Sequence, residues 1–350
     1  MKELDFEQYI RVGEPDQKEK SIAWSIGIGL QQVDGLTPSQ YLYEIARRNI
    51  EGEITIKEAK KLIDIYYESK TIRTEEEKKE KEADKVSSRI TELVEEKSFS
   101  FSINQFLSIH KRLFEGVLPN IKVGKFRDYN ITKKEWALDG DTVIYVPADL
   151  IEETLKYDLD TEKKFDYSKL SKEEVVTHFA KFIANIWQVH PFGEGNTRTT
   201  AVFAIKYLRS LGFMIGNEPF EKHSWYFRNS LVRANYSNLQ KGIYTNLEYL
   251  ERFFRNYLLG EHNELKNRFT HIRYKAEAHK NHNKVTLNLT NTQQIILEAV
   301  SHNKFISQIE IAEQYSLARE TINRNMKKLQ EQGIIKRVGA KKNGHWVVLK

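Results

Sequence analysis

Apolar residues return every three or four positions along most of this chain, which is the spacing of one face of an α-helix. The pattern predicts helices over residues 101–114, 175–189 and 199–211, and Gly212 is placed where the last of these would end. Strand-like runs are predicted around residues 130–146 and 334–349. The chain is therefore predicted to be mainly α-helical.

The helical pattern divides into segments that differ in charge and polarity. Residues 1–70 are predicted to form a small helical unit with a turn near its middle. Residues 72–85 are a mixed run of Glu and Lys that supports i, i+4 pairs on a solvated helix, and a charged helical connector is predicted over residues 71–100. The main helical domain is predicted at 101–260, followed by a polar linker at 261–289 and a second domain at 290–350.

The second domain is predicted to contain three helices followed by a hairpin whose turn holds an Asn-Gly pair. This order of elements resembles a winged helix-turn-helix. Four polar side chains of its third helix are predicted to face outward: Arg319, Asn323, Arg324 and Lys327. Such a face suits the major groove and phosphates of DNA, and it equally suits a protein partner. DNA binding and protein binding are therefore both kept as hypotheses for this domain.

Composition narrows the class of protein. With 40% hydrophobic and 30% charged residues the chain is typical of soluble globular proteins, and a net charge of +6 permits nucleic-acid contact without requiring it. No apolar run approaches the ~20 residues that span a bilayer, and the acidic N-terminus differs from a secretory signal. Cysteine is absent, which excludes disulfides and thiolate chemistry. We therefore expect a cytoplasmic protein without membrane contact.

One stretch of nine residues concentrates the chemistry of the chain. It reads His-Pro-Phe-Gly-Glu-Gly-Asn-Thr-Arg and runs from His190 to Arg198, between two predicted helices. His190 can take up a proton near neutral pH, Glu194 offers oxygens to Mg²⁺, and Arg198 can bind phosphate oxygens. The next helix begins here, and its free N–H groups attract anions. Phosphoryl or nucleotidyl transfer requires these parts.

The stretch resembles the signature of the Fic family, His-x-Phe-x-(Asp/Glu)-Gly-Asn-Gly-Arg-x-x-Arg. The resemblance implies a helical bundle with a β-hairpin flap, and the transfer of AMP from ATP to a hydroxyl of a target protein and of the enzyme itself. His190 would be the general base and Glu194 would hold Mg²⁺. The phosphates would be bound by Gly195, Asn196 and Arg198.

The chain departs from that signature at two positions. Thr197 stands where the family has Gly, so the backbone is expected to stay in the α region there, and the Thr hydroxyl becomes a candidate phosphate ligand. Ala201 stands where the second Arg is expected, which reduces the double arginine clamp to Arg198 alone. The donor therefore stays open between ATP and another phosphate-containing molecule. Elsewhere the resemblance extends from about residue 101 to residue 258.

Two further stretches match features that the resemblance implies. Residues 130–146 contain an Asp-Gly turn and occupy the place of the flap, which would pair with the target backbone as an added strand. The candidate target-binding residues are Ile131, Thr132, Lys133, Lys134, Glu135 and Trp136. Tyr226 and Phe227 would lie against adenine, with Asn235 nearby, and a place in the hydrophobic core is the alternative for the two aromatic rings.

The N-terminal segment resembles the VbhA-type antitoxin, which silences some Fic enzymes through a Ser/Thr-x-x-x-Glu-Gly helix. The aligned residues run from Leu30 to Gly35, with Asp34 in place of Glu. In the family this Glu pairs with the second Arg, the position of Ala201 here. We therefore expect a docked segment whose inhibitory contact through Asp34 and Gly35 is weak or differently built; a plain helix-ending turn is the alternative. A second candidate is the stretch from Ser88 to Glu92, which keeps Ser-x-x-x-Glu but lacks the following Gly; a plain helix is its alternative.

Together the residues and the resemblance predict a protein adenylyltransferase that uses ATP and Mg²⁺ and is modulated by its N-terminal segment. The protein target is not identified by the sequence, and a homodimer stays open. Two alternatives remain: transfer of another phosphate-containing group by the same site, or a DNA-binding regulator that uses the Fic core as a nucleotide sensor. Covalent labelling from ATP separates the enzyme from the regulator.

Overall fold

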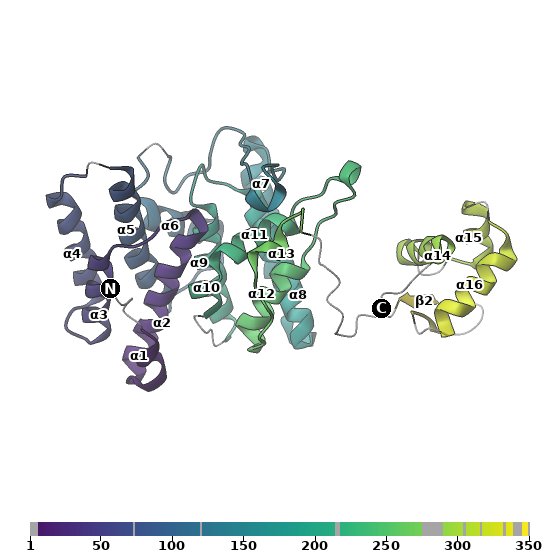
Figure 1. Ribbon diagram of the computed structural model, residues 1–350, viewed down its shortest axis with the longest axis horizontal. Coiled ribbons are helices and arrows are strands. Elements are labelled where there is room, and N and C mark those ends of the chain that lie inside the picture. Colours follow the sequence, from purple (N-terminus) through teal and green to yellow (C-terminus); the bar gives the residue numbers. More distant parts are fainter. Residues whose placement is uncertain are drawn as a thin grey trace. The chain divides into compact units, whose positions relative to one another are not determined.

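The computed structural model describes residues 6–72, 74–119, 121–213, 218–274, 290–303, 306–315, 317–331, 334–338 and 345–348. The chain divides into two compact units, Met1–Glu277 (unit 1) and Ala278–Lys350 (unit 2). Figure 1 shows that both units are built almost entirely from helices, which confirms the predicted mainly α fold.

The helices of unit 1 follow one another through loops and short 3₁₀ turns. The first elements are α1 (Glu7–Val12), α2 (Pro15–Gly29), the 3₁₀ helix η1 (Leu30–Asp34), α3 (Gln40–Ile50), α4 (Ile56–Ser69) and α5 (Glu75–Glu95). Next come α6 (Ile103–Phe114), η2 (Trp136–Leu138), η3 (Ala148–Leu150), α7 (Ile151–Lys163), η4 (Tyr167–Lys169) and α8 (Lys172–Val189). The unit is completed by α9 (Asn196–Ser210), α10 (Glu218–Lys222), α11 (Ser224–Ala234), η5 (Leu239–Lys241), α12 (Glu248–Leu259) and α13 (Asn267–Thr270).

Side-chain caps fix where several of these helices begin. Thr55, Thr74 and Ser171 each accept a hydrogen bond from a backbone N–H in the first turn of α4, α5 and α8, and a Glu three positions on bonds back to the backbone of the cap. The reciprocal bonds satisfy donors that would otherwise be unpaired, and such a cap is worth about 0.5–2 kcal/mol. α8 therefore begins at Lys172, slightly before the apolar pattern that predicted it.

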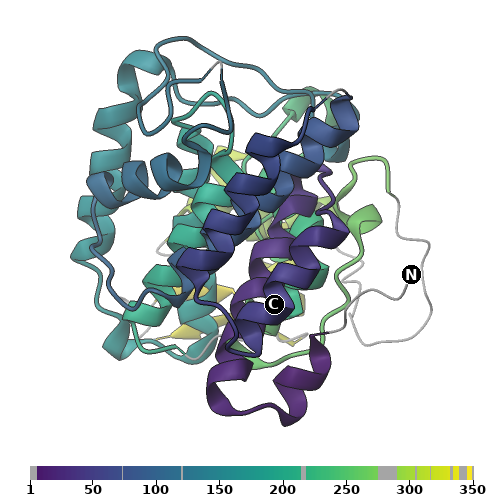
Figure 2. The ribbon, with the colours of Figure 1, turned by 90° about the vertical axis from the view of Figure 1, so that its left-hand side faces the viewer.

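The N-terminal helices share their packing with the rest of unit 1. Trp24 on α2 is buried in a cluster with residues of α3 and α4, and its indole Nε1 donates to Asn49 Oδ1 at 2.9 Å. Ile26 on α2 and Leu30 at the start of η1 are instead buried in the main cluster, with residues of α6, α8 and α9. Figure 2 views unit 1 from the side of these helices. The segment 1–70, predicted as a unit of its own, therefore belongs to unit 1.

α5 is amphipathic along its second half. The mixed charges lie in its first half, whereas Val86, Ile90 and Leu93 are buried in the main cluster. The helix contacts α2 on one side and α9 on another. The prediction of a solvated connector over residues 71–100 is therefore wrong for the second half of α5, because apolar residues at helical spacing follow the charge run.

The main cluster holds α8 and α9 in place, and these two helices carry the ends of the nine-residue stretch. Phe179 on α8 and Phe203 on α9 are fully buried in this cluster. α9 is followed by Gly212 with φ of 87°, a conformation that glycine adopts without strain, so the predicted helix end is confirmed. Residues 190–195 form the loop between the two helices.

The predicted flap is a hairpin-shaped loop without a strand ladder. Its two arms approach each other where the Glu135 N–H donates to Asp141 O at 2.9 Å, and the turn places Asp139 at φ of 57° and Gly140 at φ of 85°. No strand is assigned between residues 121 and 150, so the β-hairpin prediction is wrong in detail. The reason is η2, a 3₁₀ turn within one arm that uses the backbone donors for bonds inside the turn.

The polar stretch 261–289, predicted as a linker, is partly packed on unit 1. Thr270 at the end of α13 is fully buried, and its hydroxyl donates to Asn267 O at 2.7 Å. The Ile272 N–H donates to Ala137 O at 2.8 Å, which ties this stretch to η2. The linker prediction is therefore wrong for residues 261–274, and residues 275–289 lie outside the described part of the chain.

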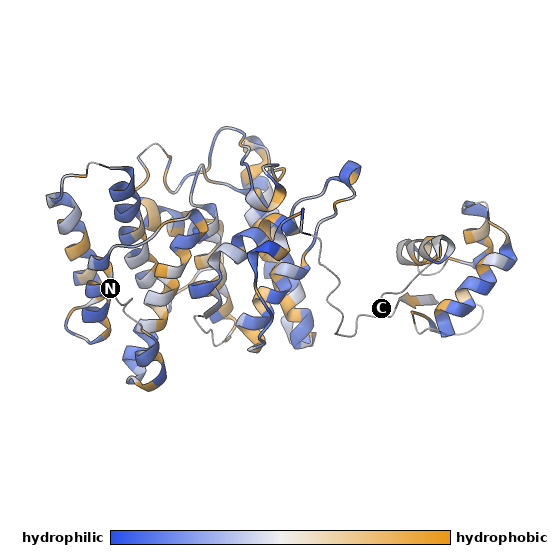
Figure 3. Ribbon diagram, in the orientation of Figure 1, coloured by the Kyte–Doolittle hydropathy of each residue, from blue (hydrophilic) through white to orange (hydrophobic). Residues whose placement is uncertain are grey.

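The helices are amphipathic, as expected when each buries one face and exposes the other. Figure 3 shows hydrophobic and hydrophilic residues mixed along the helices of both units. Among the described residues, no helix has both the length and the apolar character needed to cross a membrane.

Unit 2 has the predicted order of three helices and a hairpin. It contains α14 (Asn291–His302), α15 (Gln308–Gln314), α16 (Arg319–Glu331), β1 (Ile335–Val338) and β2 (His345–Val348). The strands are antiparallel, with Arg337 opposite Trp346, while the predicted Asn-Gly turn lies outside the described residues. Ile322, Met326 and Leu329 form the buried side of α16. The opposite side of this helix is therefore left to solvent or a partner.

Candidate active site

His190 begins the loop between α8 and α9 in a backbone conformation that is rare for a residue with a side chain. It has φ of 47° and ψ of 56°, and it caps the C-terminus of α8 with its N–H donating to Trp187 O at 3.0 Å. A left-handed residue other than glycine costs roughly 1–2 kcal/mol, so the surrounding structure must hold it. Such strain is common at functional sites.

Arg127 supplies part of that hold. Its side chain is buried, and its Nε donates to His190 O at 2.9 Å, while its backbone N–H donates to Pro191 O at 2.8 Å. A further guanidinium nitrogen donates to Tyr129 O at 2.7 Å. The arginine thus joins the start of the flap to the loop by binding carbonyl oxygens. The sequence analysis did not single it out, because a lone arginine beside a phenylalanine carries no specific signal.

The His190 imidazole is buried and kept neutral. Burial, reinforced by the positive charges of Lys133 and Arg228, lowers its pKa well below the ordinary value for histidine. Its Nδ1 lies 3.3 Å from Trp187 O, and a carbonyl accepts only, so this nitrogen carries the proton. Nε2 is buried without a hydrogen-bond partner. The ring therefore keeps an unused lone pair at Nε2 at neutral pH.

Two aromatic rings enclose this imidazole. The ring of Tyr145 lies with its centroid 4.2 Å from that of His190, and the Trp187 indole meets it edge-on at 5.1 Å. The Tyr145 hydroxyl donates to Glu135 Oε1 at 3.2 Å. Since Tyr145 and Glu135 both belong to the flap region, the flap covers one side of the His190 imidazole.

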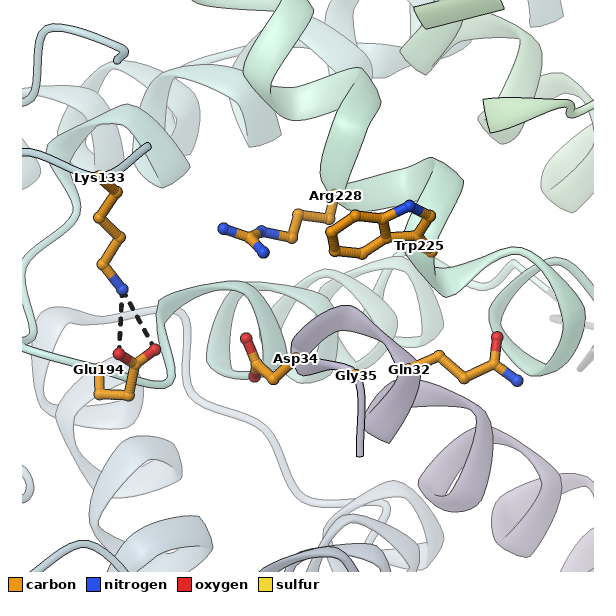
Figure 4. Close-up of a pocket in the computed structure, with 7 residues that line it drawn as sticks. All are labelled: Gln32, Asp34, Gly35, Lys133, Glu194, Trp225 and Arg228. Atoms are coloured by element: carbon orange, nitrogen blue, oxygen red, sulfur yellow. Dashed lines mark hydrogen bonds and ion pairs between the residues drawn. The ribbon is translucent and has the colours of Figure 1, made fainter. Parts of the chain in front are cut away.

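Glu194 lies at the mouth of α9 and is paired with a flap lysine. Lys133 Nζ donates to both carboxylate oxygens at 3.1 Å each, and 40% of the Glu194 side chain is exposed (Figure 4). Within the described residues, no three His, Asp or Glu side chains gather into a metal-binding group. A single exposed carboxylate still fits Mg²⁺ delivered with nucleotide phosphates, since this ion keeps several waters and needs few protein ligands.

Gly195 and Asn196 shape the start of α9. Gly195 has φ of 76°, and a Cβ built on it would lie 2.4 Å from the ring of Phe114, so no other residue fits. The Asn196 side chain is buried and closes on the loop: Nδ2 donates to Phe192 O at 2.8 Å, and Oδ1 accepts from Phe192 N at 3.0 Å. Asn196 therefore holds the loop, and in this state its side chain is occupied.

Thr197 lies inside the first turn of α9, in the helical conformation that the sequence analysis expected. Its hydroxyl accepts a hydrogen bond from Trp187 Nε1 at 3.0 Å, and the residue is buried. The structure therefore places this hydroxyl toward α8, where it holds the two helices together. Ala201, one turn on, is fully buried.

Arg198 is held by the N-terminal part of the chain. Its Nε lies 2.8 Å from Asp34 Oδ2, Nη1 donates to Gln31 Oε1 at 3.1 Å, and Nη2 donates to Glu82 Oε1 at 2.6 Å. The guanidinium also lies over the ring of Phe114 at 4.8 Å, and only 1% of the side chain is exposed. The structure thus brings Asp34 to the signature, but to the first arginine position and not to residue 201.

The other regulatory candidates lie in different places. Gly35 ends η1 with φ of 66° and lines the cavity described below. Glu92 is on α5, where its carboxylate pairs with Lys60 at 2.6 Å and Arg112 at 3.0 Å. The structure therefore does not bring Glu92 to Arg198.

A cavity of about 420 Å³ lies between η1, the flap, the loop and α11. Seven residues line it: Gln32, Asp34, Gly35, Lys133, Glu194, Trp225 and Arg228. Figure 4 shows the Arg228 side chain extending from α11 toward Lys133 and Glu194. The cavity therefore brings together the flap, the mouth of α9 and the N-terminal segment.

The aromatic residues chosen from the sequence lie beside this cavity but face the interior. Tyr226 and Phe227 are fully buried, and Phe227 packs on Phe253 with ring centroids 5.0 Å apart. Asn235 Nδ2 donates to Ala184 O on α8 and to Leu231 O on α11. Trp225 lines the cavity instead, which the sequence analysis missed. The helical i, i+3 spacing of Trp225 and Arg228 was the available signal.

The flap residues alternate between solvent and interior. Thr132, Lys134 and Trp136 are exposed, whereas Glu135 is buried and Ile131 is half-buried. Arg228 donates to both oxygens of Glu135, at 3.1 and 3.0 Å. Burial raises the pKa of Glu135, and the Arg228 charge opposes that effect. The alternation leaves the exposed set available to a target.

His110 on α6 is a second histidine of the site that the sequence analysis missed. Its Nδ1 accepts from the Gly124 N–H at 2.9 Å, which leaves Nε2 to donate to Glu194 O at 3.0 Å. The ring stacks on Phe192 with centroids 3.7 Å apart. Burial lowers the pKa of His110 to about 4. The neutral ring thus fixes the main chain of the loop at the residue that carries the carboxylate.

In unit 2, the residues chosen for nucleic acid lie on the outward side of α16. Arg319, Arg324 and Lys327 are exposed, and Asn323 is partly exposed. Lys327 lies 4.0 Å from Glu331, one turn on, in a weak surface pair. The basic face that the sequence predicted is therefore present.

Comparisons with known proteins agree with these two units. The Fic/DOC family model matches residues 100–208, and a winged helix-turn-helix DNA-binding model matches residues 289–336. No curated protein matches the chain. Among solved structures, the chain is similar to the N-terminal FIC domain of Bep8 protein, a VirB-translocated Bartonella effector protein from Bartonella sp. 1-1C. That match has 20% identity and a TM-score of 0.42, and it covers 54% of this chain and 88% of that chain.

Proposed function

Because the chain contains a Fic/DOC domain at residues 100–208, we propose that it is a protein adenylyltransferase, which moves AMP from ATP to a hydroxyl of a target protein and of itself. The observation that carries this proposal is the state of His190. Its ring is neutral and its Nε2 has no hydrogen-bond partner. The ring does not itself line the cavity, but it begins the loop whose Glu194 does. A general base needs a neutral ring with a free nitrogen lone pair.

In the proposed reaction, Nε2 of His190 takes the proton of the target hydroxyl. The hydroxyl oxygen then bonds to the α-phosphorus of ATP while the bond from that phosphorus to the bridging oxygen of pyrophosphate breaks. The leaving pyrophosphate carries the electron pair away, and the proton stays on the imidazole until solvent removes it. The Tyr145 ring covers His190 in this structure, so the reaction requires the flap to shift before the hydroxyl can approach.

Glu194 is the residue that would hold Mg²⁺, and this ion would supply charge neutralisation for the phosphates. The loop that presents the carboxylate is fixed by His110, Asn196 and Gly195, so the side chain starts from a defined position. A cytoplasmic setting, where ATP is abundant, belongs to the same proposal.

The test is a comparison of His190→Ala with wild type, using labelled ATP and the intact mass of the purified protein. We expect wild type to gain the mass of AMP, and the variant to lose labelling by about 10²–10⁴-fold, the usual contribution of a general base. His262→Ala, an exposed histidine far along the chain from the loop, is the matched control and should label normally. Equal labelling of the His190 variant and wild type would show that the mechanism is wrong.

We also propose that the N-terminal segment restrains the reaction. Asp34, Gln31 and Glu82 together occupy the arginine that the family signature gives to the phosphates. The resemblance placed this inhibitory contact at residue 201, which is Ala here. The contact at Arg198 is a differently built form of the same restraint.

A second enzyme candidate uses the same site with another phosphate-containing donor. It is favoured by the occupied side chains of Thr197 and Asn196 and by the lack of an arginine at 201, since all three change the phosphate-binding surface. The intact-mass measurement decides between the donors, because the added mass identifies the group.

A third candidate is a DNA-binding regulator whose Fic core senses nucleotide. The match of residues 289–336 to a DNA-binding family and the exposed Arg319, Arg324 and Lys327 favour it. Arg324→Ala should then weaken binding to duplex DNA and reduce its salt dependence. Tight, sequence-selective DNA binding without any covalent labelling from ATP would support this candidate over the enzyme.

A further inference from the structure

We propose that Lys133 of the flap and Arg228 of α11 hold the polyphosphate of the nucleotide while the N-terminal segment binds Arg198, the residue to which the signature gives this task. The inference rests on the proposed function, since it names the residues that bind the donor in that same cavity. It begins from the position of each cation relative to the cavity.

Arg198 is poorly placed for this task in the described state. Its side chain is 1% exposed, it does not line the cavity, and its guanidinium is bound by Asp34, Gln31 and Glu82. Moving it to a ligand would break all of these contacts. Leaving Asp34 and Glu82 without their partner would cost free energy as well.

Lys133 is the cation closest to the mouth of α9. Its ammonium carries three donors and uses two of them on Glu194, so one remains for an incoming oxygen. Its side chain is 23% exposed at the cavity wall. A divalent cation held by Glu194 would compete with Lys133 for the carboxylate, and all three ammonium donors would then be available for phosphate.

Arg228 on α11 lines the same cavity as Lys133. Its Nη2 donates to Glu135 and its Nη1 to Val33 O at 3.3 Å. A guanidinium has five N–H donors, so the contacts found among the described residues leave donors at Nε and Nη1. Its side chain is 18% exposed. The bond to Glu135 therefore orients the guanidinium without using it up.

The charges of the cavity support this assignment. Each lining carboxylate already faces a cation: Glu194 faces Lys133, and Asp34 faces Arg198. Among the described residues that line the cavity, the positively charged ones are Lys133 and Arg228. A polyphosphate that enters there meets these two side chains first, and their positive charge favours it.

Trp225 gives the cavity an apolar wall beside the same cations. Its indole lies 5.4 Å from the Arg228 guanidinium and lines the cavity. A planar base suits such a surface, whereas the phosphates suit Arg228, one helical turn away, and Lys133 of the flap. The wall also provides a spectroscopic signal, because indole emission changes when a base stacks on it.

The test uses the full chain with His190→Ala, so that no transfer occurs, and titrates ATP with Mg²⁺ in excess. Indole emission and calorimetry both report the Kd. Lys133→Gln should raise the Kd for ATP about ten- to hundredfold, the range for losing a hydrogen bond to a charged group. Lys156→Gln is the control: this lysine is exposed on α7 and outside the cavity lining, so its Kd should equal that of the parent.

The direction of the change separates two roles for Lys133. If the lysine only blocks Glu194, its removal frees the carboxylate and lowers the Kd for ATP with Mg²⁺, which would overturn the inference. Adenosine, which lacks phosphate, should bind Lys133→Gln and the parent equally. Arg228→Lys keeps the charge opposite Glu135 but removes donors, and it should also weaken ATP more than adenosine.

The same experiment distinguishes failure of the inference from failure of the proposed function. AMP transfer by wild type together with an unchanged Kd in Lys133→Gln would overturn the inference and leave the function standing. No binding of ATP to the parent, together with no labelling of wild type, would overturn both.

Discussion

His110 illustrates how a residue outside the signature determines the geometry of the signature. It bonds the backbone of Gly124 on one side and of Glu194 on the other, and only the neutral ring can accept at Nδ1 while it donates at Nε2. His190 is likewise buried and neutral. Two buried neutral histidines therefore lie at one site, and both would have to gain a charge in acid.

We predict that stability falls as the pH drops below about 6.5, and that His110 accounts for much of the fall. Its folded pKa of about 4 is below the unfolded value of 6.5, so below pH 6.5 the unfolded chain binds a proton that the folded chain does not. Stability is complete above that range, and this residue removes up to about 3 kcal/mol by pH 4.

Urea unfolding of unit 1 at several pH values measures this effect. His110→Asn should be less stable than wild type at neutral pH, because two backbone contacts are lost, and it should lose less stability on acidification. A variant with the same pH dependence as wild type would show that another group is responsible.

Three elements from distant parts of the chain meet at Arg198. η1 brings Gln31 and Asp34, α5 brings Glu82, and α9 brings the arginine. α5 is also tied to α9 at its other end, where Lys206 donates to Leu93 O at 2.7 Å. The N-terminal elements are thus attached at both ends of α9, the helix that starts at the candidate active site.

We predict that Asp34→Asn increases self-labelling from ATP by about tenfold, which lies within the 1–3 kcal/mol usual for coupling between sites. The substitution removes the carboxylate that faces Arg198 Nε while keeping the size of the side chain. The initial rate of label incorporation is the measurement.

Glu53→Gln serves as the control for that change, because it removes an exposed carboxylate of the same segment that pairs with Arg48 at 3.1 Å. Its rate should equal that of wild type. An unchanged rate in Asp34→Asn, with an unchanged melting temperature, would show that the segment does not restrain the enzyme. Deletion of residues 1–70 is a poorer test, since it would expose Ile26 and Leu30 partners in the main cluster.

At the scale of the whole molecule, the chain consists of two units with separate hydrophobic cores. The core of unit 1 draws on residues from α2 to the stretch after α12, whereas the core of unit 2 draws on α14, α15, α16 and its strands. Each has its own buried aromatic and aliphatic residues, so each satisfies the basic requirement for independent folding.

We predict that residues 1–277, produced alone, keep the thermal transition and the ATP affinity of unit 1. The reason is that, among the residues that the structure describes, the core cluster of unit 1 contains none from unit 2. Calorimetry of the full chain and of the fragment is the measurement: the full chain should show a transition that the fragment lacks. A fragment that unfolds at a much lower temperature would show that the two units depend on each other.

The sequence by itself determined the helices, the two-domain order and the loop chemistry, because these depend on local spacing. Period and capping set α6, α8 and α9, and the positions of His190, Glu194 and Gly195 follow from being adjacent in one loop. Gly195 is required by the nearby Phe114 ring, yet the signature alone already marked it.

Only the tertiary structure decided which side chains face the cavity. Tyr226 and Phe227 are adjacent to Trp225 in sequence, and α11 turns them inward because α12 covers that side. Arg198 was placed on phosphate by its position in the signature, but its charge is met by Asp34 and Glu82, far away in the chain. Such pairings depend on how distant helices pack, and local sequence patterns carry no record of that packing.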